Sequence, residues 1–424
     1  MIATKWSLFI KEVADKHMVE LSMRSCRLTE GADCCQIMAA GLMREFCWVS
    51  RFSRTTFLLL ALVVLAGCES RPNILLMNDA SAMSVKSISG TFHRIFVATN
   101  RDLQPDGINF GGNRSRQVSY ARYTVSVPRV HFPGKIEWPS NARNVSTAFT
   151  TTDMTRINGP SQLTASVNQQ LSQLPTENRE AVVFTHGFNT DFAEGLYRFT
   201  QIVHDFKLRG IALHYSWPSA GKPHSYIYDQ DSVNTARDGL EEALNGLARS
   251  NVSGITVVGH SMGGYLIVET LRQMSIKGSP VFQKKLRGVV LLSPDIDAEV
   301  FRTQLNRIKS LPKPFIIFVS NRDRALKLSA MLTGKARRLG SLTSTDQLKG
   351  LDVTLIDISN FKRGDSLNHL TTATSPALIT LISGLTRSGQ NSTKLESTSR
   401  PVALLNNAML AGNGRRIVLD PPDK

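Results

Sequence analysis

The sequence predicts an α/β fold in which a mostly parallel central sheet is covered by helices on both faces. From residue 181 onward, short apolar segments alternate with segments whose apolar residues recur at helical spacing. Several apolar segments are continuous, as expected for strands that are buried on both faces. Strands that alternate with helices form parallel sheets, and ligand sites in such sheets lie beyond the carboxyl ends of the strands.

The expected elements follow one another in a regular order. Apolar segments predict strands at 182–184, 211–215, 255–258, 289–292, 315–319 and 353–356. Helical spacing predicts helices at 162–174, 192–206, 233–247, 265–274 and 300–308, the third of them capped by Asp231 or Ser232. Further strands at 95–99 and 118–127 make residues 92–150 a β-rich N-terminal addition to the same sheet, with a turn at Gly111-Gly112.

The most informative motif is Gly-His-Ser-Met-Gly at residues 259–263. A β-branched segment before it predicts a strand, and Ile267, Leu271 and Met274 after it predict a helix. The motif therefore lies on a sharp strand-to-helix turn, which holds its central residue in a strained backbone conformation. The flanking glycines lack the Cβ atoms that would clash in such a turn. We expect Ser261 to be a nucleophile raised above the sheet; a purely structural glycine turn is the alternative.

A serine nucleophile needs two partners further along the chain. Serine is weakly nucleophilic at neutral pH, so it requires a histidine base that a carboxylate orients. On this type of fold the acid and then the histidine follow the serine, each after a strand. His369 is the only histidine after Ser261, and Asp323 follows the strand expected at 315–319. Asp295 and Asp297 follow the preceding strand and are the alternative acids.

The segment His-Gly-Phe-Asn at 186–189 follows the strand expected at 182–184. Its His-Gly pair lets the backbone turn tightly and present the N–H of Phe188, while the N–H of Met262 begins the helix after the serine. These two groups are the expected oxyanion donors, and one such donor is worth about 3–4 kcal/mol in the transition state. We expect His186 and His260 to be structural.

Three residues are candidate substrate contacts: Asn189, Trp217 and Tyr226. Trp217 follows the strand expected at 211–215, where it lines an acyl pocket or belongs to the core. Tyr226 lies in the segment 221–230, which is a candidate rim of the site. The segment 299–315 has room for a helix but not for a large lid, which favours short-chain esters.

Five short segments between residues 95 and 369 resemble those of a known family. They are Phe-Val-Ala-Thr-Asn-Arg at 96–101, His-Gly-Phe-Asn-Thr at 186–190, Ser-Trp-Pro-Ser at 216–219, Gly-His-Ser-Met-Gly at 259–263 and Asp-Arg-Ala-Leu at 323–326. Together they resemble a bacterial alpha/beta-hydrolase family of undefined substrate, whose members are often lipoproteins. The resemblance implies the alpha/beta-hydrolase fold and carboxylester hydrolysis, and it supplies no substrate.

An apolar segment at 57–67 precedes Cys68 and is too short to span a bilayer comfortably. Arg51 and Arg54 form a basic region before it, as in secretory signals. The ending Leu-Ala-Gly-Cys at 65–68 resembles the bacterial lipobox, whose cysteine is acylated and becomes the mature N-terminus. An uncleaved anchor helix is the alternative. By resemblance to enteric lipoproteins, Glu69 after the cysteine favours the outer membrane of a bacterial cell envelope.

The chain is therefore expected to divide into five parts. Residues 43–67 have the length of a secretory signal, so residues 1–42 are interpreted as a mis-assigned upstream start. Residues 68–90 are a tether and residues 91–386 form the alpha/beta-hydrolase domain. Residues 387–424 are polar and largely without periodicity, which is typical of a disordered tail.

Charge and composition limit the classes of binding partner and cofactor that we expect. The formal net charge is +16, but the cationic residues are scattered without a long run, so an anionic membrane is a better expected partner than nucleic acid. All five cysteines lie at or before Cys68. The sequence contains no phosphate loop, dinucleotide fingerprint or familiar metal-ligand spacing. We therefore expect neither a metal nor a cofactor.

The expected function is a serine hydrolase of carboxylesterase or lipase type that acts on a small or lipid-like ester at the cell envelope. An amidase or peptidase on the same triad is the first alternative, since the sequence does not distinguish ester from amide. A non-catalytic binding lipoprotein with a hydrolase fold is the second, because a fold does not by itself establish an activity. The presence of a nucleophile, an acid, a base and an oxyanion loop argues against this second alternative.

Overall fold

The computed structural model describes residues 90–139, 147–334, 337–361, 367–380 and 415–421. The chain divides into two units, residues 1–70 and 71–424, and all described residues belong to the second. The signal segment, Cys68 and residues 69–89 of the expected tether lie outside the described residues, as does most of the expected C-terminal tail.

The described residues contain a ten-stranded sheet in the order β10-β9-β8-β7-β6-β4-β5-β1-β2-β3. Neighbouring strands from β10 to β1 are parallel, whereas β2 is antiparallel to both β1 and β3. The strands are β1 (Gly90–Leu103), β2 (Phe110–Pro128), β3 (Thr150–Ile157), β4 (Glu180–Thr185), β5 (Ile211–Ser216), β6 (Gly254–His260), β7 (Leu286–Leu292), β8 (Phe315–Val319), β9 (Thr354–Asp357) and β10 (Arg415–Val418).

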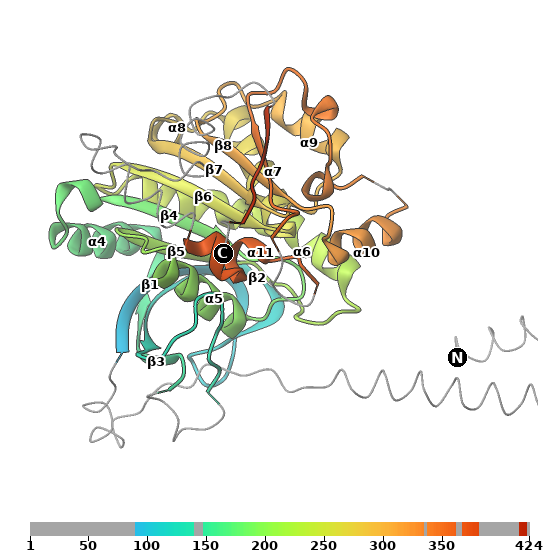
Figure 1. Cartoon of the computed structure of the whole chain (residues 1–424). Coiled ribbons are helices and arrows are strands. Elements are labelled where there is room, and N and C mark those ends of the chain that lie inside the picture. Colours follow the sequence, from blue (N-terminus) through green and yellow to red (C-terminus); the bar gives the residue numbers. More distant parts are fainter. Residues whose placement is uncertain (1–89, 140–146, 335–336, 362–366, 381–414, 422–424) are drawn as a thin grey trace, which may run out of the picture. The chain divides into compact units, whose positions relative to one another are not determined.

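Helices cover both faces of this sheet (Figure 1), so the predicted α/β fold is confirmed. The helices are α4 (Gly159–Ser172), α5 (Phe192–Asp205), α6 (Tyr226–Ala248), α7 (Met262–Lys277), α8 (Pro280–Lys285), α9 (Ala298–Leu305), α10 (Arg324–Leu332) and α11 (Thr371–Thr374). One hydrophobic cluster joins one face of the sheet to α4, α6, α7 and α9. A second cluster joins the other face to α5 and α11. The parallel strands are thus buried from both sides, which explains their continuous apolar sequences.

Two expectations for individual elements are wrong. Helix α6 begins at Tyr226, so Asp231 and Ser232 lie inside it and do not cap it. Its first turn is held by tertiary contacts, because the Tyr226 side chain is buried and bonded to neighbouring segments. Residues 226–230 of the candidate rim segment 221–230 are thus helical. Gly111-Gly112 lies within β2, where Gly112 packs closely against the backbone of Ala220.

Two strands were not predicted. β3 is rich in threonine and pairs with β2, which carries the β-rich addition beyond residue 150. β10 pairs in parallel with β9, so the expectation of a disordered tail is wrong for residues 415–418. The pairing continues past the strand, where Leu419 donates to the carbonyl oxygen of Asp357 and buries its side chain. A short segment with little pattern of its own is ordered by an existing sheet edge.

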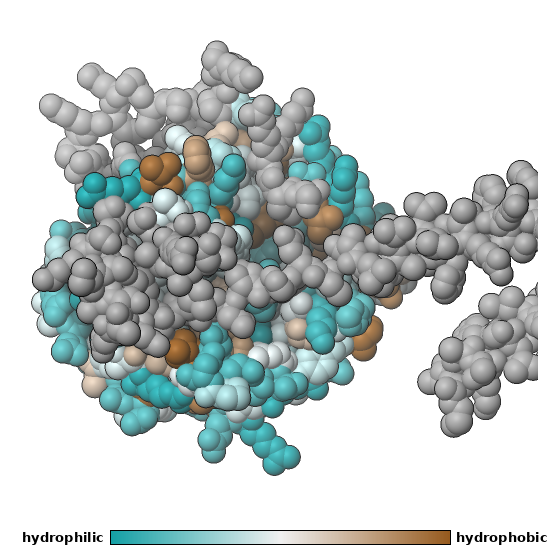
Figure 2. Space-filling view, turned by 90° about the horizontal axis from the view of Figure 1, so that it is seen from below, coloured by the Kyte–Doolittle hydropathy of each residue, from teal (hydrophilic) through white to brown (hydrophobic). Residues whose placement is uncertain are grey.

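The coloured residues on the face shown in Figure 2 are mostly hydrophilic, and the hydrophobic ones form small groups. Within the part of the chain that the structure describes, no helix is long and apolar enough to cross a membrane. Scattered exposed apolar side chains are ordinary for a globular surface.

Candidate active site

Ser261 lies on the turn between β6 and α7 with a positive φ of 54° and a ψ of −121°. This conformation is unfavourable for a residue with a side chain, so the surroundings must hold it. The glycines on either side leave no room for larger residues. A Cβ at Gly259 would lie 2.7 Å from the Cα of Gly264, and one at Gly263 would collide with the carbonyl oxygen of His186. The sequence therefore permits the close approach that the strained turn requires.

Backbone hydrogen bonds to the end of β7 and the residues just after it hold the turn. The N–H of Ser261 donates to the carbonyl oxygen of Leu292 at 3.0 Å, and its own carbonyl oxygen accepts from Asp295 at 3.2 Å. The side of the turn that faces β7 is thus fixed by the end of that strand. Ser261 is only 2 % exposed, so a molecule that reaches it must enter a narrow space.

The structure brings Asp323 and His369 together. Nδ1 of His369 lies 2.7 Å from Oδ2 of Asp323, whose side chain is fully buried. The other carboxylate oxygen of Asp323 accepts from the N–H of Leu326 at 2.9 Å and caps α10. Both oxygens of this carboxylate have a partner, so its orientation toward the imidazole is fixed.

The two alternative acids, Asp295 and Asp297, form hydrogen bonds or an ion pair with other groups. Asp295 forms an ion pair with Arg338, whose Nε lies 3.0 Å from its Oδ1, and it also accepts from Ser329 and Tyr226. Asp297 caps α9 by accepting from the N–H groups of Glu299 and Val300. Asp323, in contrast, contacts His369 at 2.7 Å.

His260 packs against His369. The ring centroids are 4.6 Å apart, and Nε2 of His260 lies 3.3 Å from the backbone carbonyl oxygen of His369, to which it donates. Burial, followed by the nearby imidazole of His369, lowers the pKa of His260 well below its usual range. His260 is therefore neutral and helps to position the segment that carries His369, in agreement with the expected structural role.

The loop after β4 lies directly against the serine. A Cβ at Gly187 would lie 2.9 Å from the Cβ of Ser261 and 2.6 Å from Nδ1 of His260. Glycine at this position thus lets the backbone that leads to Phe188 approach the nucleophile turn. Met262 is buried at the first position of α7, on the other side of the same turn. The two expected oxyanion donors come from segments that meet at Ser261.

Arg101 at the end of β1 is fully buried and was not predicted as part of the site. Its guanidinium donates to the carbonyl oxygens of Thr190, Ser219 and Gly111 at 2.8 to 2.9 Å, and Nη2 lies 3.2 Å from Nε2 of His186. Burial lowers its pKa to about 10, against the attraction of Asp191, Asp229 and other acidic neighbours. The group stays charged at neutral pH and fastens the loop that holds Phe188.

A second side chain that the sequence did not reveal is Asp229 in α6. Its carboxylate accepts from the backbone N–H of Asn189 at 3.2 Å, from the hydroxyl of Ser219 at 2.6 Å and from the N–H of Ala220 at 2.8 Å. Asn189 has a positive φ of 57°, so this contact holds a strained residue. Burial raises the pKa of Asp229, although the three hydrogen bonds oppose this rise.

Trp217 is fully buried within the main core cluster. Its indole N–H donates to the carbonyl oxygen of His186 at 2.7 Å, and its ring stacks on the imidazole of His186 at a centroid distance of 4.8 Å. Of the two predicted roles, the core position is the one observed. Through these two contacts, Trp217 holds His186 and the loop that leads to Phe188 in place.

Tyr226 lies at the edge of a pocket next to the nucleophile turn. The pocket has a volume of about 340 Å³ and is lined by Met262, Tyr265, Tyr226, Val233 and Arg338, among others. The ring of Tyr226 meets Phe188 edge to face at 5.3 Å. Its hydroxyl is bonded to Asp295 and Ser329, so the hydroxyl is engaged within the protein while the residue forms part of the pocket wall.

A strained serine on a strand-to-helix turn, at the carboxyl edge of a largely parallel sheet, defines an alpha/beta hydrolase fold. The chain belongs to the family described as alpha/beta hydrolase of unknown function (DUF900), which matches residues 161–385. This membership agrees with the resemblance seen in the sequence. No curated protein matches the chain.

Solved structures of hydrolases resemble the chain only distantly. An esterase from Pyrobaculum calidifontis has 11% identity and a TM-score of 0.34, and the alignment covers 73% of this chain and 89% of that one. Dienelactone hydrolase from Anabaena variabilis has 12% identity and a TM-score of 0.30, with coverages of 62% and 90%. Thermogutta terrifontis esterase 2 has 12% identity and a TM-score of 0.30, with coverages of 66% and 91%. Likenesses of this size carry no argument about activity.

Proposed function

We propose that this protein is a serine hydrolase that cleaves carboxylic esters with Ser261, His369 and Asp323. The observation that carries the proposal is the 2.7 Å hydrogen bond between Asp323 and His369 at the same sheet edge as the strained Ser261. A carboxylate on Nδ1 keeps the proton there, so Nε2 of the imidazole is the atom that accepts a proton from the serine. This is the state that a general base needs.

The proposed reaction has two halves. Ser261 attacks the ester carbonyl carbon while His369 takes the hydroxyl proton, and His369 then gives this proton to the leaving alcohol. Water repeats the attack on the acyl-enzyme, the acid product leaves, and Ser261 regains its proton. Asp323 stabilises the imidazolium that forms in each half without itself becoming protonated.

The tetrahedral oxyanion is proposed to bind the N–H groups of Phe188 and Met262. Support comes from the close approach of Gly187 to Ser261 and from the position of Met262 at the start of α7. Donors at a helix start and on a fixed loop need little reorganisation as charge develops. Arg101 and Asp229 act as positioning residues for this loop rather than as catalytic residues.

The proposed substrates are short-chain esters. The pocket beside Met262 and Tyr226 is modest in volume, and the low exposure of Ser261 disfavours bulky acyl groups. The segment between α9 and β8 is short, which leaves no room for a large lid there. We therefore expect activity on soluble esters without an oil–water interface.

We further propose that acylated Cys68 tethers the enzyme to a bacterial membrane, with the outer membrane favoured. Support comes from the apolar segment 57–67, its basic flank and the lipobox-like ending before Cys68. The excess of cationic residues is compatible with an anionic lipid surface. No role in nucleic-acid binding is proposed.

Covalent labelling tests the proposed function. A fluorophosphonate should attach to Ser261 and abolish hydrolysis of short aryl esters in parallel, while Ser261→Ala should take up no label. Hydrolysis rates over a panel of acyl-chain lengths, with matched anilides, separate an esterase from an amidase or peptidase. A folded protein that neither reacts with the probe nor hydrolyses any member of the panel would leave the binding-lipoprotein alternative standing.

A further inference from the structure

A cluster of histidines and carboxylates lies away from the nucleophile turn, at the C-terminal end of α5. His204 and Asp205 are the last residues of this helix, which ends shortly before β5 begins. The cluster is therefore at the amino edge of the parallel strands, opposite to Ser261. The segment after β2 contributes His131, and β1 contributes His93.

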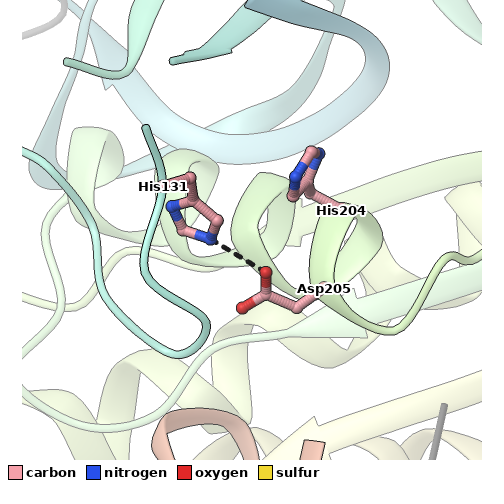
Figure 3. Close-up of side chains that lie close together, drawn as sticks. All are labelled: His131, His204 and Asp205. Carbon is pink, nitrogen blue, oxygen red and sulfur yellow. Dashed lines mark hydrogen bonds and ion pairs between the residues drawn. The ribbon is translucent and has the colours of Figure 1, made fainter. Parts of the chain in front are cut away.

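The three central side chains have the spacing of metal ligands. His131, His204 and Asp205 each present one ligand atom, and these atoms lie within 4.8 Å of one another. Figure 3 shows the imidazole of His131 directed at the carboxylate of Asp205, with the ring of His204 on the neighbouring side. The side chains of His131 and Asp205 are almost inaccessible to water, at 5 % and 2 % exposure.

Neighbouring groups orient these ligand atoms. Nδ1 of His131 lies 2.7 Å from a carboxylate oxygen of Glu137, which leaves Nε2 directed at Oδ1 of Asp205, 2.8 Å away. The other oxygen of Asp205 accepts from the N–H of Gly134 and from the amide of Gln201. Histidines that bind metals commonly carry such a carboxylate on the opposite ring nitrogen.

His204 is oriented by another imidazole. Its Nδ1 lies 3.0 Å from Nε2 of His93, so one of the two nitrogens donates to the other. The ring centroids of His131 and His204 are 5.2 Å apart at an interplanar angle of 87°. Two imidazoles that approach one carboxylate from different directions leave a position between them that suits a small cation.

The hydrogen bonds of His131 mark the place for a cation. Its two ring nitrogens face carboxylate oxygens of Glu137 and Asp205, at 2.7 and 2.8 Å. A positive charge between the ring and Asp205 is therefore balanced by two carboxylates.

We propose that His131, His204 and Asp205 form a zinc site. Imidazole nitrogens with one carboxylate oxygen are a ligand set that zinc prefers, and three protein ligands leave a fourth position for water. The zinc ion takes the place of the proton between His131 and Asp205, and this proton is released to solvent. The role is structural, because the ion joins two segments of the chain and the side chains of His131 and Asp205 are almost inaccessible to water.

The zinc site fastens the segment 129–139 to α5, and it also reaches α11. The amide of Gln201 donates both to Asp205 and to the carbonyl oxygen of Ala373, at 2.5 and 3.1 Å. A Cβ at Gly134 would collide with the carbonyl oxygen of Thr374. Since α11 begins two residues after His369, zinc binding stabilises the segment that follows the proposed general base.

Zinc content of the tag-free full-length protein tests the proposal. After removal of metals with a chelator and dialysis, titration with zinc chloride should give one tightly bound zinc ion per chain and a higher Tm. His204→Ala should lose this ion and the Tm increase. Glu137→Gln should weaken zinc binding by about 10- to 100-fold, as expected for a group that orients a ligand. His224→Ala, which changes an exposed histidine, should bind zinc as the parent does.

His204→Ala separates the zinc site from a simple ion pair. His204 is not a partner in the hydrogen bond between His131 and Asp205, so its removal leaves that bond intact and the fold is expected to survive. If the cluster were only an ion pair, zinc would not raise the Tm of the parent. The parent and His204→Ala would then have the same Tm in the presence of zinc. That result, or a zinc stoichiometry unchanged in the folded His204→Ala protein, overturns the proposal.

Discussion

Asp295 and Arg338 form a buried ion pair in which Oδ1 and Nε are 3.0 Å apart. The cation and two hydroxyls engage the carboxylate that sequence order left as an alternative acid. Asp323, one strand further along, instead meets His369. Replacement of Asp323 by asparagine is therefore expected to lower kcat, whereas the same replacement at Asp295 is expected mainly to lower stability.

Asp323→Asn should lower kcat by about 10⁴ while the fold survives. An asparagine can still cap α10 through its carbonyl oxygen, which accepts from the N–H of Leu326. Its NH₂ group then faces Nδ1 of His369 and forces the proton onto the other ring nitrogen, so the imidazole cannot act as a base. Rates on a short aryl ester, together with circular dichroism, check this prediction.

Asp295→Asn is the matched control for the acid. It leaves Arg338 as a buried cation without its carboxylate, so it should lower the free energy of unfolding by a few kcal/mol and reduce kcat far less than Asp323→Asn does. Asp297→Asn, at a helix cap, should cost less still. A larger loss of kcat in Asp295→Asn than in Asp323→Asn would reassign the acid to the end of β7.

Ser261→Ala and His369→Ala should each remove nearly all turnover, by about 10⁶-fold, and the double variant should be little worse. The reason is that the nucleophile and the base act as one unit, so the second change removes nothing that is still in use. Steady-state kinetics of the three variants provide the measurement. Independent, multiplying effects of the two substitutions would contradict a shared role.

Arg101→Met should lower both the Tm and kcat. The substitution removes the donors to Thr190 and Ser219, and these bonds hold the loop that carries Phe188. Carbonyl groups left without partners in the interior cost about 1–3 kcal/mol each. Arg116→Met, which changes an exposed arginine of the adjacent strand β2, is the control and should behave as the parent. An unchanged kcat in a destabilised Arg101→Met would limit Arg101 to a purely structural role.

The sequence predicted the parts of this molecule that have local patterns. The parallel strands and the turn at Ser261 follow from apolar periodicity and glycine placement within about ten residues. The order of Ser261, Asp323 and His369 follows from the succession of strands. The sequence favoured Asp323 over Asp295 as the acid, and the structure adds the contact between Asp323 and His369, which no local pattern could show.

Other features depend on contacts between distant segments and leave no local signal. Arg101 meets Thr190 and Ser219 from positions roughly 90 and 120 residues away in sequence. His131 meets Asp205 in the same manner, so the zinc cluster shows none of the short spacings by which metal motifs are found. The strand β10 is ordered by the edge of β9, not by its own composition.

Cys68→Ser should release the protein from membranes or leave its precursor unprocessed. Acylation of the cysteine is the proposed anchor, and a hydroxyl cannot replace the thiol in that modification. Fractionation of cells and intact-mass measurement of the mature chain check this outcome. Membrane association of an unacylated protein would contradict the proposed anchor.

Acid should destabilise the fold through its buried neutral histidines. Burial, and then the charge of Arg101, lowers the pKa of His214 to about 3 in the folded protein, and neither of its ring nitrogens has a hydrogen-bond partner. The unfolded chain protonates this group near its ordinary pKa of about 6.5. His214 therefore does not lower the free energy of unfolding above about pH 6.5. Its protonation in the unfolded chain lowers this free energy as the pH falls from about 6.5 toward about 3.

His214→Leu should remove this contribution to acid sensitivity. One histidine that protonates only on unfolding costs up to about 1.4 kcal/mol per pH unit within that window. The variant should lose less unfolding free energy than the parent between about pH 7 and about pH 5, whatever its stability at neutral pH, because His186 and His260 contribute equally to both proteins. Denaturant titrations at several pH values measure the slope, with the exposed His224→Leu as control. Parallel pH profiles for the parent and His214→Leu would show that His214 is not kept neutral by burial.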